Sequence, residues 1–325
     1  MMRPLISSAA LLFALSVLAS GAEPAEGFGP WSAVEQPALH ELAKGRIATS
    51  TNTGMNLDRG LSVQAIYLIH APIEAATQAL LAFDSSKHPE LGTIQHHTFQ
   101  DEKDAAFDTL RLDAKVAASA SLVRAARDPK RLQMSRDEAA RIPKDRTAEG
   151  ARQFLASILQ QRWTRFSQPG DLGGVRSYDA RSEIRSLLGE EPKIAGRFTT
   201  LLAPFGKKAG VGTPKLHYWD VSEVDSMGAI GLGALYLSNT DRRRQILDLT
   251  YYSSGGYLVS LALYEFAPVT VNDRLATLVW QGCLVSSTEL VGGLGIKRQI
   301  AARIMIGDVE KSIRAFLKDA EKAGH

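Results

Sequence analysis

The sequence predicts an α+β fold in which an antiparallel sheet packs against a long helix near the C-terminal end of the chain. The first observation is a series of extended segments rich in β-branched, aromatic and leucine residues, Gln245–Tyr252, Tyr257–Phe266 and Arg274–Val285. The connections between them are short and carry turn residues, at Ser253–Gly256 and Pro268–Asp273. Because a parallel return needs a crossover of about a dozen residues or more, these strands are expected to be antiparallel neighbours.

A change of hydrophobic period after these strands is the second observation. From Ile296 the apolar residues are spaced as on one face of a helix, at Ile296, Ile300, Ile304, Val309, Ile313, Phe316 and Leu317. This spacing predicts an amphipathic helix of about 25 residues whose apolar stripe lies on the sheet. Gly307 lies within it, where glycine costs about 1 kcal/mol relative to alanine, and indicates a bend or a close approach to another element. On the polar side, solvation of Arg298 and Arg303 is favoured over contact with an anionic headgroup.

A curved antiparallel sheet that grips a long C-terminal helix resembles the START-like, or helix-grip, superfamily, which includes lipid-transfer domains and polyketide cyclases. Ser62–Asp84 adds to the resemblance, because such domains often open with a strand, a short break and a helix ending in Phe-Asp. The resemblance covers residues of about 45–112 and 215–320. It implies the fold and a binding cavity between sheet and helix, and it implies no particular reaction.

The N-terminal segment is typical of a secretory signal peptide over residues 1–22. Arg3 supplies the positive charge, Leu5–Leu18 is largely apolar, and Ser20-Gly21-Ala22 offers small residues for cleavage. The apolar part is shorter than the ~20 residues of a membrane span, so no stable span is expected after cleavage. Residues 23–44 are predicted to be a leader with a short helix over Trp31–Lys44. The single cysteine, Cys283, excludes an intramolecular disulfide, and export without disulfides fits a bacterial periplasm.

Residues 45–325 are predicted to form one START-like domain with a helical insertion at about 114–205. The other expected strands are Arg46–Thr51, Leu61–Ile69, Gly92–Gln100, Ala106–Asp113, Lys215–Val221 and Ala234–Leu237, with a helix from Pro72 to Leu81 after the second. Helical spacing is clearest within the insertion, at Ala151, Phe154, Leu155, Ile158, Leu159, Arg162, Trp163 and Phe166. The insertion is expected either to cap the cavity or to form a small subdomain.

Several function classes are disfavoured by the composition and by missing motifs. A net charge of +3, from 38 basic and 35 acidic residues, argues against nucleic-acid binding through phosphate contacts. Gly231-Leu232-Gly233 lacks the spacing of a dinucleotide fingerprint and is interpreted as a bulge or bend, so no cofactor is predicted. His96 and His97 are neighbours, would point to opposite faces of a strand, and predict no metal site. The sequence contains no G-x-S-x-G motif, and no catalytic residue is assigned.

The aromatic residues of the predicted sheet are the best candidates for ligand contacts. Tyrosine and tryptophan offer an apolar body and a polar tip, which suits a cavity for an amphiphilic molecule and also suits a plain sheet core. Gly282 beside Trp280 leaves space, which favours a pocket. The predicted ligand-binding residues are Trp219, Tyr236, Tyr252, Tyr264, Trp280 and Ile304.

The leading functional hypothesis is periplasmic binding of a hydrophobic or amphiphilic small molecule, such as a lipid, between the sheet and the C-terminal helix. The alternative is an enzyme of the cyclase or hydrolase type, in which an inward Asp248 or Glu265 acts with tyrosines. Asp220, beside Trp219, is a third carboxylate in an apolar strand. An inward carboxylate would have a raised pKa. A third hypothesis is a structural protein whose cavity is filled by its own side chains.

Overall fold

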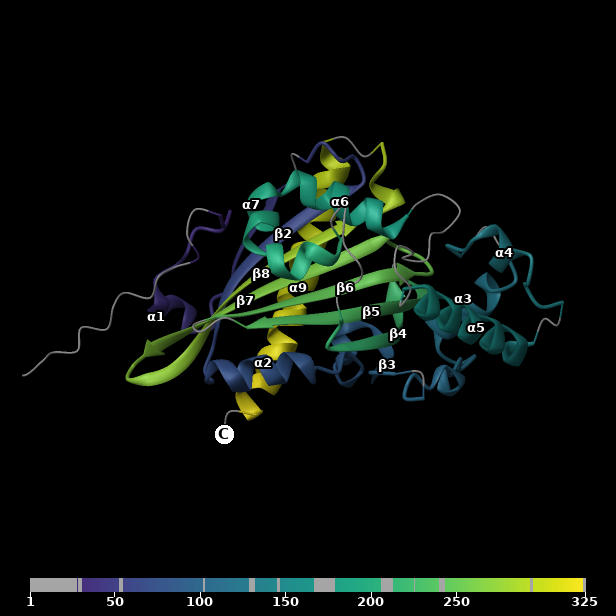
Figure 1. Ribbon diagram of the computed structural model, residues 1–325, viewed down its shortest axis with the longest axis horizontal. Coiled ribbons are helices and arrows are strands. Elements are labelled where there is room, and N and C mark those ends of the chain that lie inside the picture. Colours follow the sequence, from purple (N-terminus) through teal and green to yellow (C-terminus); the bar gives the residue numbers. More distant parts are fainter. Residues whose placement is uncertain are drawn as a thin grey trace, which may run out of the picture.

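The computed structural model describes residues 28–323 apart from 29–30, 53–54, 102, 129–131, 145–146, 167–178, 206–212, 225, 240–242 and 293–294. The predicted signal peptide at 1–22 lies outside the described residues. The fold is α+β, as predicted: a curved, open antiparallel sheet of eight strands packs against the C-terminal helix α9 (Ile296–Ala323) (Figure 1). The strand order is β1-β2-β8-β7-β6-β5-β4-β3.

The strands are β1 (Ala48–Asn52), β2 (Gly60–Ile69), β3 (Thr93–Phe99), β4 (Leu216–Val224), β5 (Met227–Asn239), β6 (Arg244–Ser253), β7 (Val259–Val271) and β8 (Arg274–Ser286). Every neighbouring pair is antiparallel, which confirms the predicted β6–β7–β8 series. Strand β5 includes the glycine-rich stretch before Ala234, and its register with β6 shifts between Leu232 and Gly233. An irregularity therefore lies at the expected glycines, although the extra residue is Tyr251 of β6. The strand predicted at Ala106–Asp113 is wrong, because this segment forms a short 3-10 turn whose Phe107 and Leu110 pack into the hydrophobic core between the insertion and the sheet, here called the insertion core.

Strand β7 extends further than its sequence predicts, through Pro268 to Val271. Pairing with β6 ends at Phe266, so the later residues of β7 pair with β8 alone. A proline that lacks an N–H is tolerated on such a free edge. The turn is reduced to Asn272-Asp273, both with positive φ, which is the geometry of a tight two-residue hairpin.

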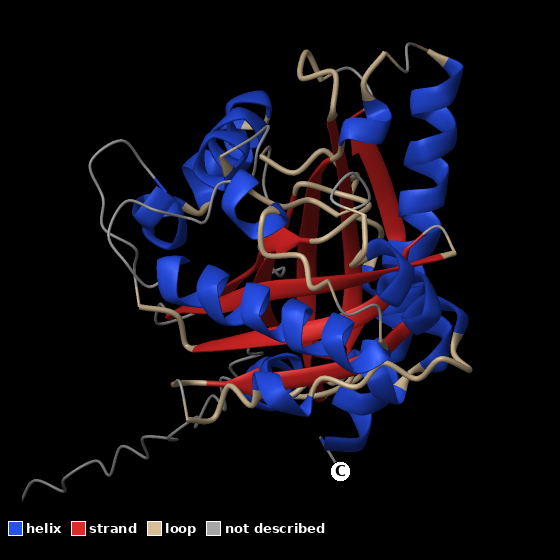
Figure 2. Ribbon diagram, turned by 90° about the vertical axis from the view of Figure 1, so that its right-hand side faces the viewer, coloured by secondary structure: helices blue, strands red, loops and turns tan. Residues whose placement is uncertain are grey.

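The remaining helices are α1 (Leu39–Leu42), α2 (Ile73–Leu81), α3 (Ala117–Ala125), α4 (Arg136–Ala139), α5 (Ala148–Phe166), α6 (Ala180–Glu190), α7 (Pro192–Arg197) and α8 (Thr199–Leu202). Helix α1 is much shorter than the helix expected over Trp31–Lys44. Helices α2 and α9 cover one face of the sheet, and α6, α7 and α8 of the insertion cover the other, so that the sheet lies between two helical layers (Figure 2). The insertion therefore does not cap the side of the sheet that holds α9.

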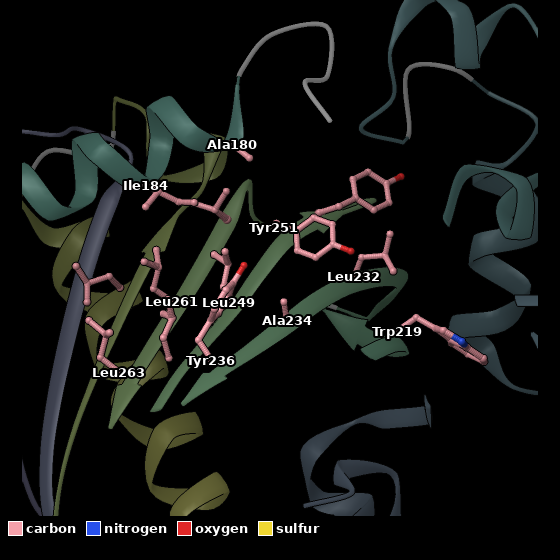
Figure 3. Packing of buried hydrophobic residues seen from close by; sticks show 14 of the residues in the cluster. Ala180, Ile184, Trp219, Leu232, Ala234, Tyr236, Leu249, Tyr251, Leu261 and Leu263 are labelled. Atoms are coloured by element: carbon pink, nitrogen blue, oxygen red, sulfur yellow. The ribbon is translucent and has the colours of Figure 1, made fainter. Parts of the chain in front are cut away.

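Strand alternation separates two hydrophobic cores, one on each face. In β7, Val259, Leu261 and Leu263 join the insertion core, whereas Tyr264 and Phe266 face α9. The insertion core is continuous from α6 to the far strands of the sheet, as the packed side chains in Figure 3 show. Both faces of β7 are apolar, which is why the sequence alone does not identify the face that carries α9.

Buried ion pairs connect the insertion to the sheet and to itself. Glu183 of α6 accepts two hydrogen bonds of 2.8 Å from Arg59, which precedes β2, and a third of 2.8 Å from Ser286 of β8. Within the insertion, Glu138 and Arg162 are each 1% exposed and are joined by bonds of 2.8 and 2.6 Å. The carboxylates of Glu183 and Glu138 are thus both compensated by an arginine, which offsets the cost of burying their charge.

Helix α9 packs on the sheet through only part of its predicted apolar stripe. Val309, Ile313 and Phe316 are buried, as expected. In contrast, Ile296, Ile300 and Ile304 are 75%, 54% and 60% exposed, so the prediction is wrong for the first turns of the helix.

Arg298 is neither simply solvated nor free for a headgroup. It donates hydrogen bonds of 2.9, 2.8 and 2.6 Å to the backbone carbonyls of Met55, Leu57 and Gly60. These bonds hold the first turns of α9 against the segment before β2. The helix start is thus fixed by polar contacts, and its isoleucines stay exposed.

Two glycines provide a matched test of how the helices pack: Gly228 lies against α3, and Gly307 of α9 lies in open space. A Cβ at Gly228 of β5 would lie 2.1 Å from the carbonyl oxygen of Ala118 in α3, whereas a Cβ at Gly307 of α9 meets no atom within 4 Å. The interpretation of Gly307 as a close approach is therefore wrong. We expect Gly228→Ala to lower the free energy of unfolding by about 1–3 kcal/mol through overpacking. Gly307→Ala should raise it by about 0.5–1 kcal/mol. Chemical denaturation of both variants measures the difference, and equal effects would contradict the α3–β5 contact.

Candidate functional site: a groove between the sheet and α9

A groove runs between the sheet and α9 and consists of two adjoining hollows of about 370 and 640 Å³. We call the smaller hollow the inner lobe; its lining includes Tyr67, His96, Tyr218, Asp220, Leu235 and Phe316. The larger is the outer lobe; its lining includes Ala262, Cys283, Val285, Ile300, Ile304 and Met305. Five residues line both lobes, Asp248, Tyr264, Gln281, Asp308 and Ser312. The lobes therefore adjoin each other at these five side chains, and we call the two together the groove.

The structure places two of the six predicted ligand-binding residues at this groove. Tyr264 lies between the lobes, and Ile304 lines the outer lobe from α9. The other predicted residues, Trp219, Tyr236, Tyr252 and Trp280, are buried on the opposite face of the sheet in the insertion core. Figure 3 shows Trp219 and Tyr236 among the side chains of that core.

These buried aromatic rings pack against residues of the insertion and of the N-terminal segment. Trp280 packs on Trp31 with ring centroids 4.5 Å apart. Its ring also fills the space over Gly282, where a Cβ would lie 2.3 Å away, so the pocket expected there is absent. Tyr252 lies under the Arg162 guanidinium at 4.6 Å, and Trp219 donates to the Ala105 carbonyl at 2.8 Å. This face of the sheet is a filled core.

The groove face carries a polar cluster outside the six predicted ligand-binding residues, although two of its members, Asp220 and Asp248, are candidate carboxylates of the sequence. The Tyr218 hydroxyl donates a hydrogen bond of 2.7 Å to Asp248 and lies 3.0 Å from the Thr250 hydroxyl. Asp220 lies on the same face of β4, two residues after Tyr218, and lines the inner lobe. The cluster thus brings together Tyr218, Asp220, Asp248 and Thr250 from β4 and β6.

Two glycines of β5 make room for this cluster. A Cβ at Gly233 would lie 2.1 Å from the ring of Tyr218, and one at Gly231 would lie 2.6 Å from the carboxylate of Asp220. The side chains of β4 therefore lie across β5 toward β6. Alternate glycines opposite Tyr218 and Asp220 were the sequence signal for this arrangement, and the pairing register that makes it readable appears only in the structure.

The electrostatics of the two aspartates differ from those of ordinary surface carboxylates. Burial, together with the nearby charge of Asp248, raises the pKa of Asp220 to about 7. Burial likewise raises the pKa of Asp248 to about 6, although the hydrogen bond from Tyr218 opposes this effect. Both side chains are half-buried at the groove, and neither forms an ion pair within the described part of the chain.

Two further polar atoms at the inner lobe have no hydrogen-bond partner among the described residues. They are the hydroxyl of Tyr67, a residue only 1% exposed, and Nδ1 of His96. Burial holds the pKa of His96 below its usual value, so this imidazole is mostly neutral near pH 7. His97 lies on the other face against Trp219, with ring centroids 5.5 Å apart, which confirms that the two histidines diverge.

Glu265, the second carboxylate of the enzyme hypothesis, is held in buried ion pairs and does not reach the groove. It is fully buried on the insertion face and accepts bonds of 2.7 Å from Arg197 and 2.8 Å from Gln245, with Arg243 also in contact. Burial would raise its pKa, but these donors outweigh burial and hold the pKa below its usual range. Glu265 is therefore a charged anchor for α7 and lies away from the groove.

Cys283 faces the outer lobe, and burial raises the pKa of its thiol to about 12. The thiol therefore stays protonated at neutral pH and acts as a small apolar group, as its strand position predicts.

The described residues hold no group of three or more metal-ligating side chains placed for one ion. Among the same residues, no helix combines the length and apolar character needed to cross a bilayer.

The raised pKa values of the aspartates predict an unusual pH dependence of stability. Between about pH 4 and pH 7 the folded protein keeps protons that the unfolded chain has lost, so stability falls as the pH rises through this window. We expect the wild type to lose on the order of 2–4 kcal/mol between pH 5 and pH 8 relative to the double variant Asp220→Asn, Asp248→Asn. Urea unfolding at both pH values measures this. Parallel pH profiles of the two proteins would disprove the buried-carboxylate account.

The environment of Glu265 predicts a different result from its removal. Glu265→Gln leaves Arg197 and Arg243 without their carboxylate and should lower the free energy of unfolding by about 2–4 kcal/mol, because breaking a buried pair leaves uncompensated charge. Glu149→Gln is the control, since its pair with Arg152 is on the surface and should contribute no measurable stability. Denaturation midpoints compare them. A neutral Glu265→Gln would show that α7 is held by other contacts.

Comparison with known proteins does not assign the chain to a family. No model of a known protein family matches the chain, and no curated protein matches it. The packing of an antiparallel sheet against a C-terminal helix is compatible with the helix-grip arrangement. Membership of the START-like superfamily stays a prediction, and the groove is the feature on which a functional proposal rests.

Proposed function

We propose that the protein binds a hydrophobic or amphiphilic small molecule, lipid-like in character, in the groove between the sheet and α9. The observation that carries this proposal is the contrast between the two faces of one sheet. Aromatic side chains fill the central part of the insertion face, and a separate hollow of about 390 Å³ lies at its end, beside α3. The α9 face keeps two adjoining hollows of about 370 and 640 Å³ along the middle of the sheet. A purely structural protein gains nothing from leaving apolar side chains exposed along such hollows, because burying them would stabilise the fold.

The outer lobe suits an apolar chain. Ile300 and Ile304 of α9 are more than half exposed and line this lobe opposite Ala262 and Val285 of the sheet. Exposed apolar side chains that gather at a hollow are typical of a ligand-binding groove. Burying them beneath a hydrocarbon chain contributes about 25 cal/mol per Å² of apolar surface, so binding needs no special motif.

Acid–base catalysis on the bound molecule is the second candidate function. It is favoured by one observation, the raised pKa of Asp248 beside the hydroxyl of Tyr218 in the groove. A carboxylate that titrates near neutral pH can act as a general acid or base. The two candidates differ in outcome, because a binding protein releases its ligand unchanged and an enzyme releases a product.

The proposal places the protein in the bacterial periplasm. Support comes from the sequence of residues 1–22, which is typical of a secretory signal, and from the presence of one cysteine only. A periplasmic protein that binds amphiphiles would meet its ligands as single molecules between two membranes.

Blocking the outer lobe tests the binding proposal. Ala301 of α9 lines this lobe, and Ala301→Trp would fill part of it. We expect the variant to bind the apolar fluorescent probe N-phenyl-1-naphthylamine at least about tenfold more weakly than the wild type, as a loss of about 1.4 kcal/mol implies. Arg303→Trp is the matched control, because Arg303 is exposed on the same helix and does not line the groove.

Fluorescence titration with both variants decides the outcome. The control should keep the wild-type affinity, and thermal unfolding should show that both variants are folded. Equal probe binding by Ala301→Trp and the wild type would rule out the groove as the binding site.

A further inference from the structure

We propose that the inner lobe receives a protonated amine, so that the ligand of the groove is a cationic amphiphile with its hydrocarbon chain in the outer lobe. This inference rests on the proposed binding function and specifies the chemistry of its ligand. Two observations carry it independently, the uncompensated carboxylates of Asp220 and Asp248 and the unpartnered hydroxyl of Tyr67.

The charges around the inner lobe leave the two aspartates without a cation. From α9, Lys311 pairs with Asp308 at 3.1 Å, and Lys318 lies 3.6 Å from Glu90. Each lysine is therefore paired with another carboxylate, and neither balances the negative charge of Asp220 and Asp248 when the aspartates are ionised.

The other titratable groups at the groove do not supply the missing cation. His96 of β3 is kept mostly neutral by burial. Tyr67, Tyr218 and Tyr264 contribute neutral phenols, because burial raises their pKa values well above the usual one. At the far end of the outer lobe, Lys297 and Glu289 carry opposite charges. A cation from outside the described residues therefore fits the aspartates best.

The hydroxyl of Tyr67 is the second observation. Tyr67 is 1% exposed, lines the inner lobe from β2 and has no hydrogen-bond partner among the described residues. A buried hydroxyl without a partner is unfavourable, and a ligand that hydrogen-bonds to it would recover that cost. Its oxygen accepts an N–H bond, as the aspartate oxygens do. A protonated amine supplies several N–H donors and one positive charge.

The order of the lobes fits a molecule with a charged head and an apolar tail. Asp248 and Tyr264 line both lobes, so the two lobes adjoin where a head group would meet its chain. There it meets Ile300 and Ile304. A fatty acid would bring a third negative charge beside the two aspartates, and a fatty alcohol would leave their charge unbalanced. Of these three head groups, only the amine both balances the charge of the aspartates and donates hydrogen bonds to Tyr67.

Competition among amphiphiles of equal chain length tests the inference. Dodecylamine, dodecanol and dodecanoic acid, each below its solubility limit or micelle concentration, are titrated against bound N-phenyl-1-naphthylamine at pH 8. We expect dodecylamine to bind at least about tenfold more tightly than dodecanol and dodecanoic acid to bind most weakly. At pH 5 the preference for the amine should shrink, because the aspartates take up protons while the amine stays charged.

Isosteric variants assign the effect to the aspartates. Asp220→Asn and Asp248→Asn should reduce the preference for dodecylamine over dodecanol to less than about threefold, while both variants still bind the probe. Asp137→Asn removes the same charge from an exposed position on α4 and should leave the preference unchanged. Unfolding curves confirm that each variant is folded.

The outcomes separate this inference from the proposed function. Binding of the probe with equal competition by all three amphiphiles would overturn the amine site and leave the binding function standing. Failure of the wild type to bind probe or amphiphile would overturn both. Lysophosphatidylethanolamine identifies the source of the amine: competition as strong as that of dodecylamine assigns a lipid head group, and weaker competition assigns a free alkylamine.

Discussion

The close passage of β4 side chains over two glycines of β5 is the constraint on which the groove depends. A Cβ at Gly233 would lie 2.1 Å from the Tyr218 ring, and a Cβ at Gly231 would lie 2.6 Å from Asp220. Without side chains there, the hydroxyl of Tyr218 reaches Asp248 on β6 at 2.7 Å. One backbone feature thereby brings together the phenol and both carboxylates. The polar end of the groove therefore depends on the absence of side chains at Gly231 and Gly233 of β5.

The two faces of the sheet divide stability and function between them. The insertion face is filled by aromatic and aliphatic side chains and is anchored by compensated buried charges, of which Glu265 with Arg197 is the clearest. The α9 face keeps open volume and two carboxylates that have no compensating cation in the described part of the chain. Strained electrostatics of this kind are typical of functional sites, because folding alone gains nothing from them.

The sequence predicted the elements better than the site, for a physical reason. Period and turn residues are local, and they predicted β6, β8, most of β7 and helix α2 correctly. Which face of β7 holds Tyr264 and which holds Glu265 depends on long-range packing, because both faces are apolar. Trp280 was therefore assigned to a cavity although its ring fills the space over Gly282. Tyr218 and Asp220 were missed as a pair because only the β4–β5 register places them opposite glycines.

The central claim is that the groove is occupied by an amphiphile, and the most direct measurement is made on the natural contents of the protein. The protein is purified under native conditions and extracted with organic solvent, and the extract is examined by mass spectrometry. The account predicts one compound at close to one equivalent per chain, with a hydrocarbon portion and an amine. An extract with no compound above a few per cent of the protein concentration would contradict it.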